Sequence, residues 1–333
     1  MKILGYTLAT IFLIALALWI LFWSYSHKTY DVGYGISFSP DHATSLGLDW
    51  RQTYTAMITD LHPNYIRIAA MWSDIESEEG TYDFSNVDWM MEEAAKYKVK
   101  VTLVVGQKAP RWPECHVPEW VNDVDNETYR TKLLAYVRAV VEHYQDHPAL
   151  ELWQVENEAF IRFAFGDCAR FDKDAVYSEL ALVRHLDNTH KIIMTDSGEL
   201  ASWRKPSKLG DIFGTTLYRK VRTPGGHIVS YDWLPAGFYR LKAAFWNNAY
   251  TNFIISELQA EPWFTDSTPL DTSIETMEET MNPEQLQANI DYAEHIGASR
   301  AYFWGVEWWY FMKTEKQDNR YWELIQQTLQ PKR

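Results

Sequence analysis

The chain has 333 residues, of which 47% are apolar and 15% aromatic, enough to fill one barrel of about 250 to 300 residues or two smaller domains. Its formal net charge is −14, from 31 basic and 45 acidic residues, and it contains no run rich in Lys or Arg. This composition argues against nucleic-acid binding, which needs clustered basic side chains to neutralise phosphates.

The first 28 residues predict a helix that spans a membrane. The segment from Ile3 to Ser26 has 24 uncharged residues, enough to cross a hydrocarbon core of about 30 Å. A cleaved signal peptide would have a shorter apolar centre and a clearer small-residue exit, so an uncleaved anchor is favoured over a signal peptide. Because positive charges that precede such a span stay in the cytoplasm, Lys2 predicts an extracytoplasmic location for the large domain, residues 29–333.

Past residue 30, short β-branched runs alternate with longer stretches of helical period, which is typical of βα units around a parallel sheet. The apolar runs are residues 32–38, 65–71, 99–105, 149–155, 191–195, 211–218, 252–258 and 300–306. Helices are predicted at residues 50–62, 85–97, 126–145, 173–186 and 282–297. Eight strands with intervening helices predict a (β/α)8 barrel. The alternative is a doubly wound open sheet, but the first strand is not followed by a GxGxxG loop. Residues 220–250 and 259–281 are predicted to be loops on one rim.

Polar side chains gather at the predicted C-terminal strand ends, where barrels of this kind carry their chemistry. They are Arg67, Gln107, Lys108, Arg111, Trp112, Asn157, Glu158, Tyr218, Arg219, Glu257, Trp304 and Glu307. Glu158 ends the fourth strand and Glu257 the seventh, so the two carboxyl groups should face each other across the barrel mouth. Glycoside hydrolysis needs such a pair, one protonated as an acid and one ionised as a nucleophile or base.

Asn157 and Glu158 at the end of the fourth strand, with Glu257 in "IISELQ" at the end of the seventh, resemble the clan A glycoside hydrolases. This four/seven superfamily includes cellulases, mannanases and related β-glycosidases. The resemblance extends to "IRIAAMWSDIESEEGTYDF" at residues 66–84 and to the aromatic eighth strand "YFWGVEWW" at residues 302–309. It implies a retaining β-glycosidase that acts on an extracytoplasmic oligo- or polysaccharide by double displacement.

The resemblance also implies a role for each matching residue. Glu158 would be the acid/base and Glu257 the nucleophile. Arg67 would favour the ionised form of Glu257, and Tyr218 would donate a hydrogen bond to it. Asn157 would hold the sugar 2-hydroxyl.

Three tryptophans are candidates for contacting the sugar. The resemblance implies that Trp304 forms the floor beneath the sugar at the cleavage point. Trp112 and Trp263 follow strands three and seven, and each could line the cleft or simply pack on the rim. The sequence departs from the clan pattern at Gln107 and Leu217, where many members carry His, so the clan's subsite contacts are not transferred to this chain.

Glu156 is a second candidate for the acid, because residues two apart share a face of a strand. The clan pattern places Asn directly before the acid, and this selects Glu158. Glu156 is then predicted to lie behind the site or on the surface.

Cys115 and Cys168 are the two cysteines of the chain, and their spacing alone allows a disulfide or two free thiols. Because they follow strands three and four, in neighbouring rim loops, a disulfide is favoured. His116 beside Cys115 has no second close Cys/His pair, so neither a metal nor another cofactor is expected. A monomer is expected.

A competing class of function is a barrel that binds glycan without cleaving it. A pure binder has no need to keep two acids in one mouth, so the hydrolase is favoured. A metal-dependent hydrolase would need His-x-His or similar ligands, which the chain lacks.

Overall fold

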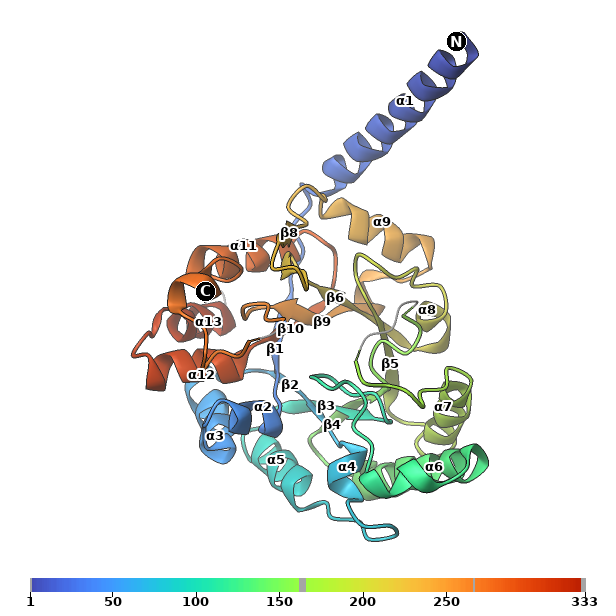
Figure 1. The fold of residues 1–333 in the computed structure, drawn as a ribbon, viewed down its shortest axis with the longest axis vertical. Helices are drawn as coiled ribbons and strands as arrows, with labels where there is room; N and C mark the ends of the chain where they lie inside the picture. The colour runs from blue at the N-terminus through green and yellow to red at the C-terminus, as the bar shows by residue number, and fades with distance from the viewer. Residues whose placement is uncertain (1, 162–165, 266, 331–333) are drawn as a thin grey trace.

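The computed structural model describes residues 2–161, 166–265 and 267–330, so residues 162–165, 266 and 331–333 of the predicted large domain lie outside the described part. Eight parallel strands form a closed barrel in the order β1-β10-β9-β6-β5-β4-β3-β2 (Figure 1). They are β1 Gly33–Ser37, β2 Tyr65–Ala69, β3 Lys100–Val105, β4 Leu150–Val155, β5 Lys191–Asp196, β6 Ile212–Leu217, β9 Phe253–Gln259 and β10 Arg300–Trp304. Each coincides with one of the eight predicted runs, so the predicted (β/α)8 barrel is confirmed.

A ring of helices surrounds the barrel (Figure 1). They are α2 Pro40–Ser45, α3 Trp50–Leu61, α4 Trp72–Ile75, α5 Ser85–Lys96, α6 Asn126–Tyr144, α7 Ala175–Leu186, α8 Pro206–Leu209, α9 Gly237–Phe245, α10 Ile274–Glu278, α11 Pro283–Ala293, α12 Val306–Glu315 and α13 Arg320–Leu329. Short 3-10 turns lie at Glu119–Asp123 and Tyr250–Asn252. Side-chain caps fix several starts: Asp49, Asp125 and Asn282 each accept a hydrogen bond from a backbone N–H of the first helical turn.

The two segments predicted to be loops contain regular structure. Residues 220–250 include a two-stranded hairpin, β7 Lys220–Arg222 and β8 Ile228–Ser230, followed by α9. Residues 259–281 include α10. The prediction of plain loops was therefore wrong there. The strands of the hairpin have three residues each, too few for an alternating pattern to be recognised in sequence.

The barrel interior is layered, and the layers position the site. An apolar layer closes the N-terminal part of the barrel; its buried members are Leu152, Ile193, Ile212, Ile254 and Tyr302. Because every second residue of a strand points inward, Gln154 and Thr195 are the next inward positions after Leu152 and Ile193, and Thr216 lies on the inward face of β6 four residues past Ile212. These buried polar side chains separate the apolar floor from the mouth.

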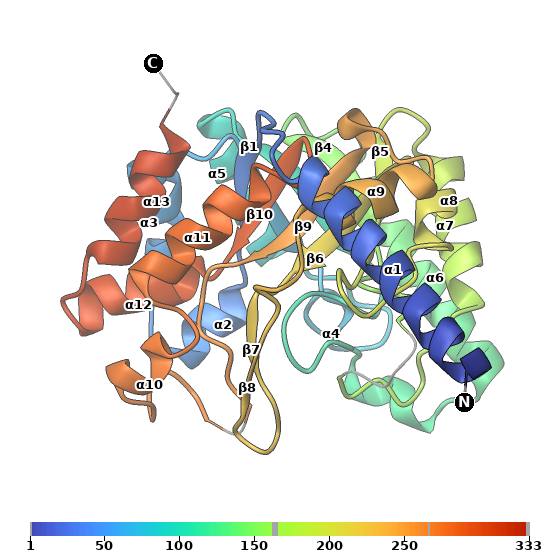
Figure 2. The ribbon, with the colours of Figure 1, turned by 90° about the horizontal axis from the view of Figure 1, so that it is seen from above.

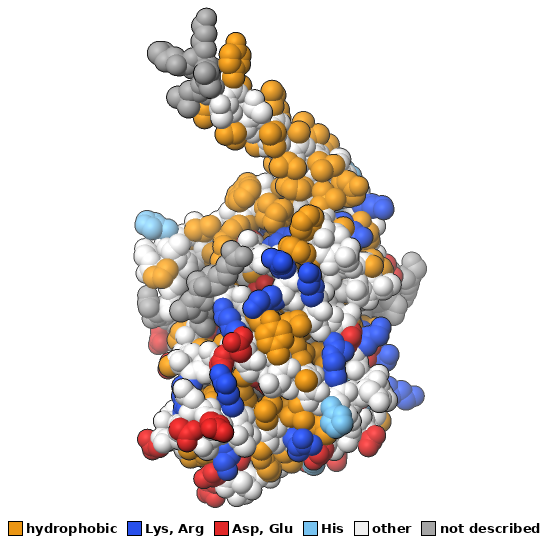
Figure 3. Space-filling model, turned by 90° about the vertical axis from the view of Figure 1, so that its right-hand side faces the viewer, with side chains coloured by type: hydrophobic (Ala, Val, Ile, Leu, Met, Phe, Trp, Pro, Cys, Tyr) orange, Lys and Arg blue, Asp and Glu red, His pale blue; other side chains and the backbone are white. Residues whose placement is uncertain are grey.

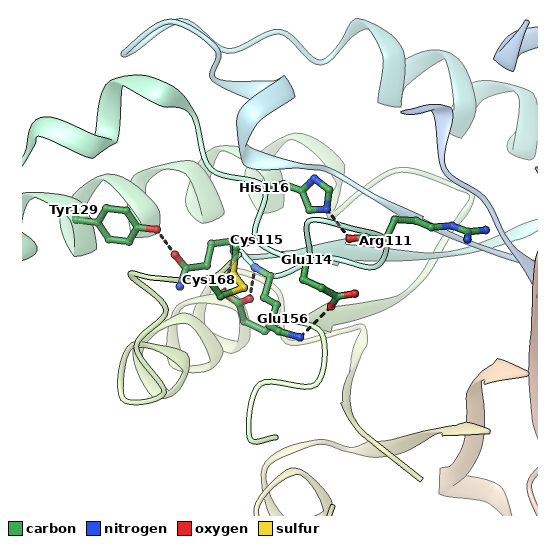
Figure 4. Close-up of a disulfide and its surroundings, with 9 residues drawn as sticks. Arg111, Glu114, Cys115, His116, Tyr129, Glu156 and Cys168 are labelled. Carbon is green, nitrogen blue, oxygen red and sulfur yellow. Dashed lines mark hydrogen bonds and ion pairs between the residues drawn. A yellow bond between two sulfur atoms is a disulfide. The ribbon is translucent and has the colours of Figure 1, made fainter. Parts of the chain in front are cut away.

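Cys115 and Cys168 form the predicted disulfide, with an S–S distance of 2.05 Å (Figure 4). The bond joins the loop after β3 to the loop after β4 and closes 53 residues of chain. It therefore ties together the two loops that border the fourth strand at the mouth.

Replacing both cysteines with serine should lower the free energy of unfolding by about 4 kcal/mol, because the unfolded chain regains the entropy of an open loop of 53 residues. In a barrel of this size the melting temperature should fall by about 6 °C. Differential scanning calorimetry measures the change, with wild-type protein in dithiothreitol as the matched control. Equal melting temperatures for the variant and the oxidised wild type would contradict this expectation.

The N-terminal helix α1, Lys2–Tyr25, projects from the barrel beside α9 (Figure 1). Its residues Tyr6–Tyr25 have a mean hydropathy of 2.2 and are not buried by the rest of the chain. A helix of this length and composition could serve as a membrane anchor or as a signal sequence.

Candidate active site

The C-terminal ends of the strands surround a cavity of about 840 Å³. Glu158 after β4 and Glu257 in β9 both line it, so the structure brings the two predicted carboxyl groups to one hollow. Asn157, Tyr218 and Trp304 also line this cavity. The layers of buried side chains inside the barrel leave these side chains room only on the side of the mouth.

Glu257 is held by a cation and a hydroxyl group. Arg67 Nη1 lies 3.0 Å from Glu257 Oε1, and Tyr218 donates a hydrogen bond of 2.7 Å to Glu257 Oε2. The side chains of Arg67 and Glu257 are only 1% and 5% exposed, so water screens their attraction little. Both contacts stabilise the negatively charged carboxylate and fix its orientation.

Glu158 lies in a different environment, although it shares the cavity. It is 7% exposed, and Thr216 donates a hydrogen bond of 3.2 Å to its Oε1. Burial, followed by the negative charge of Glu257, raises the pKa of Glu158 to about 8. At neutral pH this carboxyl group therefore keeps its proton, whereas the neighbouring Glu257 contacts a cation.

Asn157 lies between the two glutamates in the chain of contacts, and its side-chain carbonyl accepts three hydrogen bonds. Its Oδ1 accepts hydrogen bonds from Arg67 Nη2 at 2.9 Å, Gln154 Nε2 at 3.1 Å and Thr195 Oγ1 at 3.2 Å. The amide nitrogen is the donor end of the side chain, and it interacts with the Glu114 carboxyl group. A donor in this position suits the predicted contact with a sugar hydroxyl.

Glu156 is completely buried, so the prediction that it could lie on the surface was wrong. Its carboxylate accepts hydrogen bonds from the backbone N–H groups of Gln107 at 2.9 Å and Lys108 at 2.5 Å (Figure 4). A Cβ atom at Gly106 would lie 2.6 Å from this carboxylate, so only glycine fits there. Glu156 thus braces the loop after β3 and does not line the cavity.

Several charged groups that line the cavity were not singled out from the sequence, and two of them, Glu114 and Glu261, belong to ion pairs. Glu114 forms a buried ion pair with Lys108, with 3.0 Å between Nζ and Oε2 (Figure 4). Burial raises the pKa of Glu114 to about 7, and the Lys108 ammonium opposes this rise. Glu114 lies in the loop that the disulfide fixes, several residues past the strand end, and only the folded loop brings it to the mouth.

The second of these groups is Glu261, which shares Arg111 with Glu307. Arg111 Nη2 lies 2.8 Å from Glu307 Oε2, and its other nitrogen contacts Glu261. Although burial alone would raise it, the Arg111 guanidinium lowers the pKa of Glu261 to about 2. His42 joins the cluster at 3.5 Å from Glu261. The Arg111 guanidinium contacts both carboxylates, so these residues do not suggest a metal site.

The three predicted tryptophans take different positions. Trp304 is 8% exposed and lines the cavity, but the Arg111 guanidinium lies 4.1 Å from its ring centroid and covers one face. Trp263 packs edge-on against Tyr218 at 5.1 Å and also lines the cavity. Trp112 is 72% exposed at the rim. A sugar can therefore meet Trp263 and the uncovered face of Trp304.

Other polar residues at the strand ends point away from the mouth. Gln107 accepts a hydrogen bond from Tyr129 of α6, and Arg219 stacks on Tyr292 with 3.8 Å between the guanidinium carbon and the ring centroid. Neither Gln107 nor Arg219 lines the cavity. Both are buried and tie the strand ends to the surrounding helices.

Comparison with known proteins agrees with this fold. A family model described as beta-galactosidase, glycoside hydrolase family 42, matches residues 37–171. Beta-galactosidase Pbg of Clostridium perfringens is 26% identical over 151 residues, which cover 40% of this chain and 22% of that protein. A beta-galactosidase of Arthrobacter sp. is 27% identical over 146 residues, which cover 38% of this chain and 20% of that protein. The matches thus span only about a fifth of these curated relatives.

Solved structures extend the likeness over most of the barrel. Native xylanase 10B of Thermotoga maritima has a TM-score of 0.60 at 14% identity and covers 92% of this chain and 98% of its own. Beta-galactosidase of Bacillus circulans sp. alkalophilus has a TM-score of 0.58 at 14% identity, covering 83% and 50%. The predicted resemblance to the clan A (β/α)8 glycoside hydrolases is therefore confirmed by the family match over residues 37–171 and by the shared fold. Within this clan, its sequence likeness is to the beta-galactosidases of family 42.

Proposed function

We propose that the protein is a retaining β-glycosidase that uses Glu158 as the acid/base and Glu257 as the nucleophile. The observation that carries this proposal is the contrast between the two carboxyl groups in one cavity. Glu257 is paired with Arg67 and Tyr218, whereas Glu158 is buried, forms no ion pair with any cation of the described residues and holds a proton at neutral pH. Double displacement requires this division of roles.

β-Galactosides are the first substrates to test, since the curated relatives are named as beta-galactosidases. Purified full-length protein in detergent would be incubated with aryl β-galactosides, β-xylosides and β-glucosides. Proton NMR of the first product anomer should show the β form. An α anomer as first product would rule out retention, and binding without turnover on every substrate would favour a glycan-binding barrel.

We propose further that residues 1–28 anchor the protein and that residues 29–333 form the catalytic domain outside the cytoplasm. The support is the length and hydropathy of α1 and the absence of burial along it. The Lys2 charge before the span and the disulfide on the other side are consistent with this orientation. Detection of the intact N-terminal peptide in membrane fractions by mass spectrometry would test retention of the anchor.

Replacing Glu114 with glutamine should move the alkaline limb of the pH–activity profile to lower pH. The charges that act on Glu158 come from Glu257, Lys108, Glu114 and Asp196. The Glu114 charge raises the pKa of Glu158 and the Lys108 charge lowers it, so removing the former leaves the latter unbalanced.

The alkaline limb of the profile is followed by measuring kcat/KM as a function of pH. Glu114→Asp keeps the charge and should restore most of the wild-type profile, and Glu119→Gln, exposed in the same loop, serves as the matched control. An unchanged limb in Glu114→Gln would show that the pair has only a structural role.

A further inference from the structure

Helix α1 contacts the barrel directly at α9. The ring of Phe22 packs edge-on against Phe238 of α9 at 5.6 Å, and the backbone N–H of Gly237 donates a hydrogen bond of 2.7 Å to Ser26 Oγ. A Cβ atom at Gly237 would lie 2.0 Å from the carbonyl oxygen of Phe22, so the helices touch where only glycine fits. Because the apolar segment runs to Tyr25, a bilayer crossed by α1 must reach the barrel surface.

The direction of α1 decides which part of the barrel meets this bilayer. Figure 2 shows α1 running from its contact with α9 toward the side of the molecule that carries the β7–β8 hairpin. Figure 3, seen from the α9 side, shows hydrophobic side chains continuing from α1 onto the barrel at its base, with Lys and Arg side chains below. The hairpin follows β6 at the mouth, so the mouth lies on the side toward which the anchor points.

The rim of the mouth is unusually apolar. Outside α1, the described exposed large hydrophobic side chains are nine, and six of them follow strand ends at the mouth: Trp112, Leu200, Ile228, Val229, Trp233 and Leu270. Trp112 and Trp233 are 72% and 68% exposed. Exposed aromatic and aliphatic side chains around one opening are typical of a surface that inserts into the headgroup region of a membrane.

The charge distribution points the same way. Residues 197–250, which contain α8, the hairpin and α9, carry eight Lys or Arg and three Asp or Glu, in a chain with a net charge of −14. Arg204, Lys205 and Lys208 of this segment are exposed. These basic side chains lie on the flank of the barrel that carries α8 and α9, beside the point where α1 leaves it (Figure 1), and there they favour contact with anionic lipid headgroups.

We propose that the mouth of the barrel rests on the membrane that α1 anchors it to, and that the substrate is a glycan linked to a lipid of that membrane. This inference rests on the proposed glycosidase function. Trp112 and Leu200 line the catalytic cavity as well as the rim, so the aglycone can pass from the lipid surface to Glu158. Hydrolysis breaks the bond between the anomeric carbon and the lipid oxygen, which takes the proton of Glu158, and water supplies the hydroxyl of the released sugar.

The proposed contact between the rim and the membrane is tested with the full chain in vesicles of phosphatidylcholine, with and without phosphatidylglycerol. A nitroxide label at Trp233→Cys should show high collision with oxygen and low collision with an aqueous nickel chelate. The same label at Tyr97→Cys, on the opposite side of the barrel from α1, should show the reverse. This measurement requires no turnover, so it tests the membrane contact independently of the proposed glycosidase function. A label at position 233 as aqueous as that at position 97 would overturn the inference.

The substrate class is tested with a β-galactosyl lipid in the same vesicles and a soluble aryl β-galactoside. The rim variant Ile228→Ser/Trp233→Ser, whose residues do not line the cavity, should lower turnover of the lipid-linked substrate at least about fivefold and leave the soluble one unchanged. Tyr97→Ser is the matched control. Equal effects on both substrates, or wild-type turnover of the soluble substrate alone, would overturn the lipid-linked assignment. Turnover of neither substrate by the wild type would instead remove the proposed function.

Discussion

Replacing Glu257 with alanine should lower kcat for an aryl β-galactoside by at least about 10⁴-fold. The carboxylate that would form the covalent sugar intermediate is lost, while Arg67 and Tyr218 are left facing an empty position. Substrate binding should change much less, because Asn157, Trp263 and Trp304 remain in the cavity. Steady-state kinetics with the wild type and the variant measure both quantities.

Azide tests the role assigned to Glu257. In the variant, azide can enter from the face that the carboxylate occupied, and the product should be the α-glycosyl azide. The exposed Glu284→Ala on α11 serves as the matched control and should keep wild-type kcat. A β-glycosyl azide from Glu257→Ala would exchange the roles of the two glutamates, and wild-type activity would remove Glu257 from the mechanism.

Replacing Glu158 with alanine should lower kcat/KM by about 10² to 10⁴-fold for substrates whose leaving group needs a proton. The loss should be much smaller for a dinitrophenyl glycoside, whose leaving group departs as a stable anion. An equal loss for both leaving groups would contradict the assignment of Glu158 as the acid. In the variant, azide should give the β-glycosyl azide.

The pH profile provides an independent readout of Glu158. Its pKa of about 8 means that the acid form predominates below this pH and is lost above it. Wild-type kcat/KM should therefore fall as the pH rises through about 8, nearly tenfold per pH unit beyond it. Glu158→Ala should lack this alkaline limb, and a limb that persists in the variant would have to come from another group.

Local patterns were sufficient for the barrel. The β-branched runs, the helical periods between them and caps such as Asn282 depend on neighbours in the chain, so they can be recognised without the fold. The same holds for the Asn157 and Glu158 pair, because a parallel barrel sends every strand end to one face. The hairpin β7–β8 and the helix α9 were missed, since three-residue strands and a nine-residue helix leave too short a pattern.

The sequence by itself determined the barrel and the face at which Glu158 and Glu257 lie, because both follow from periodicity and from position at a strand end; the choice of Glu158 over Glu156 came from the resemblance to the clan. Only the tertiary structure decided that Glu156 braces the β3 loop, that Arg111 covers one face of Trp304 and that Glu114 and Glu261 reach the mouth. These contacts join residues far apart in the chain through loops whose course depends on the disulfide and on packing against other loops. No local sequence pattern specifies the path of these loops, so the contacts can be identified only in the folded chain.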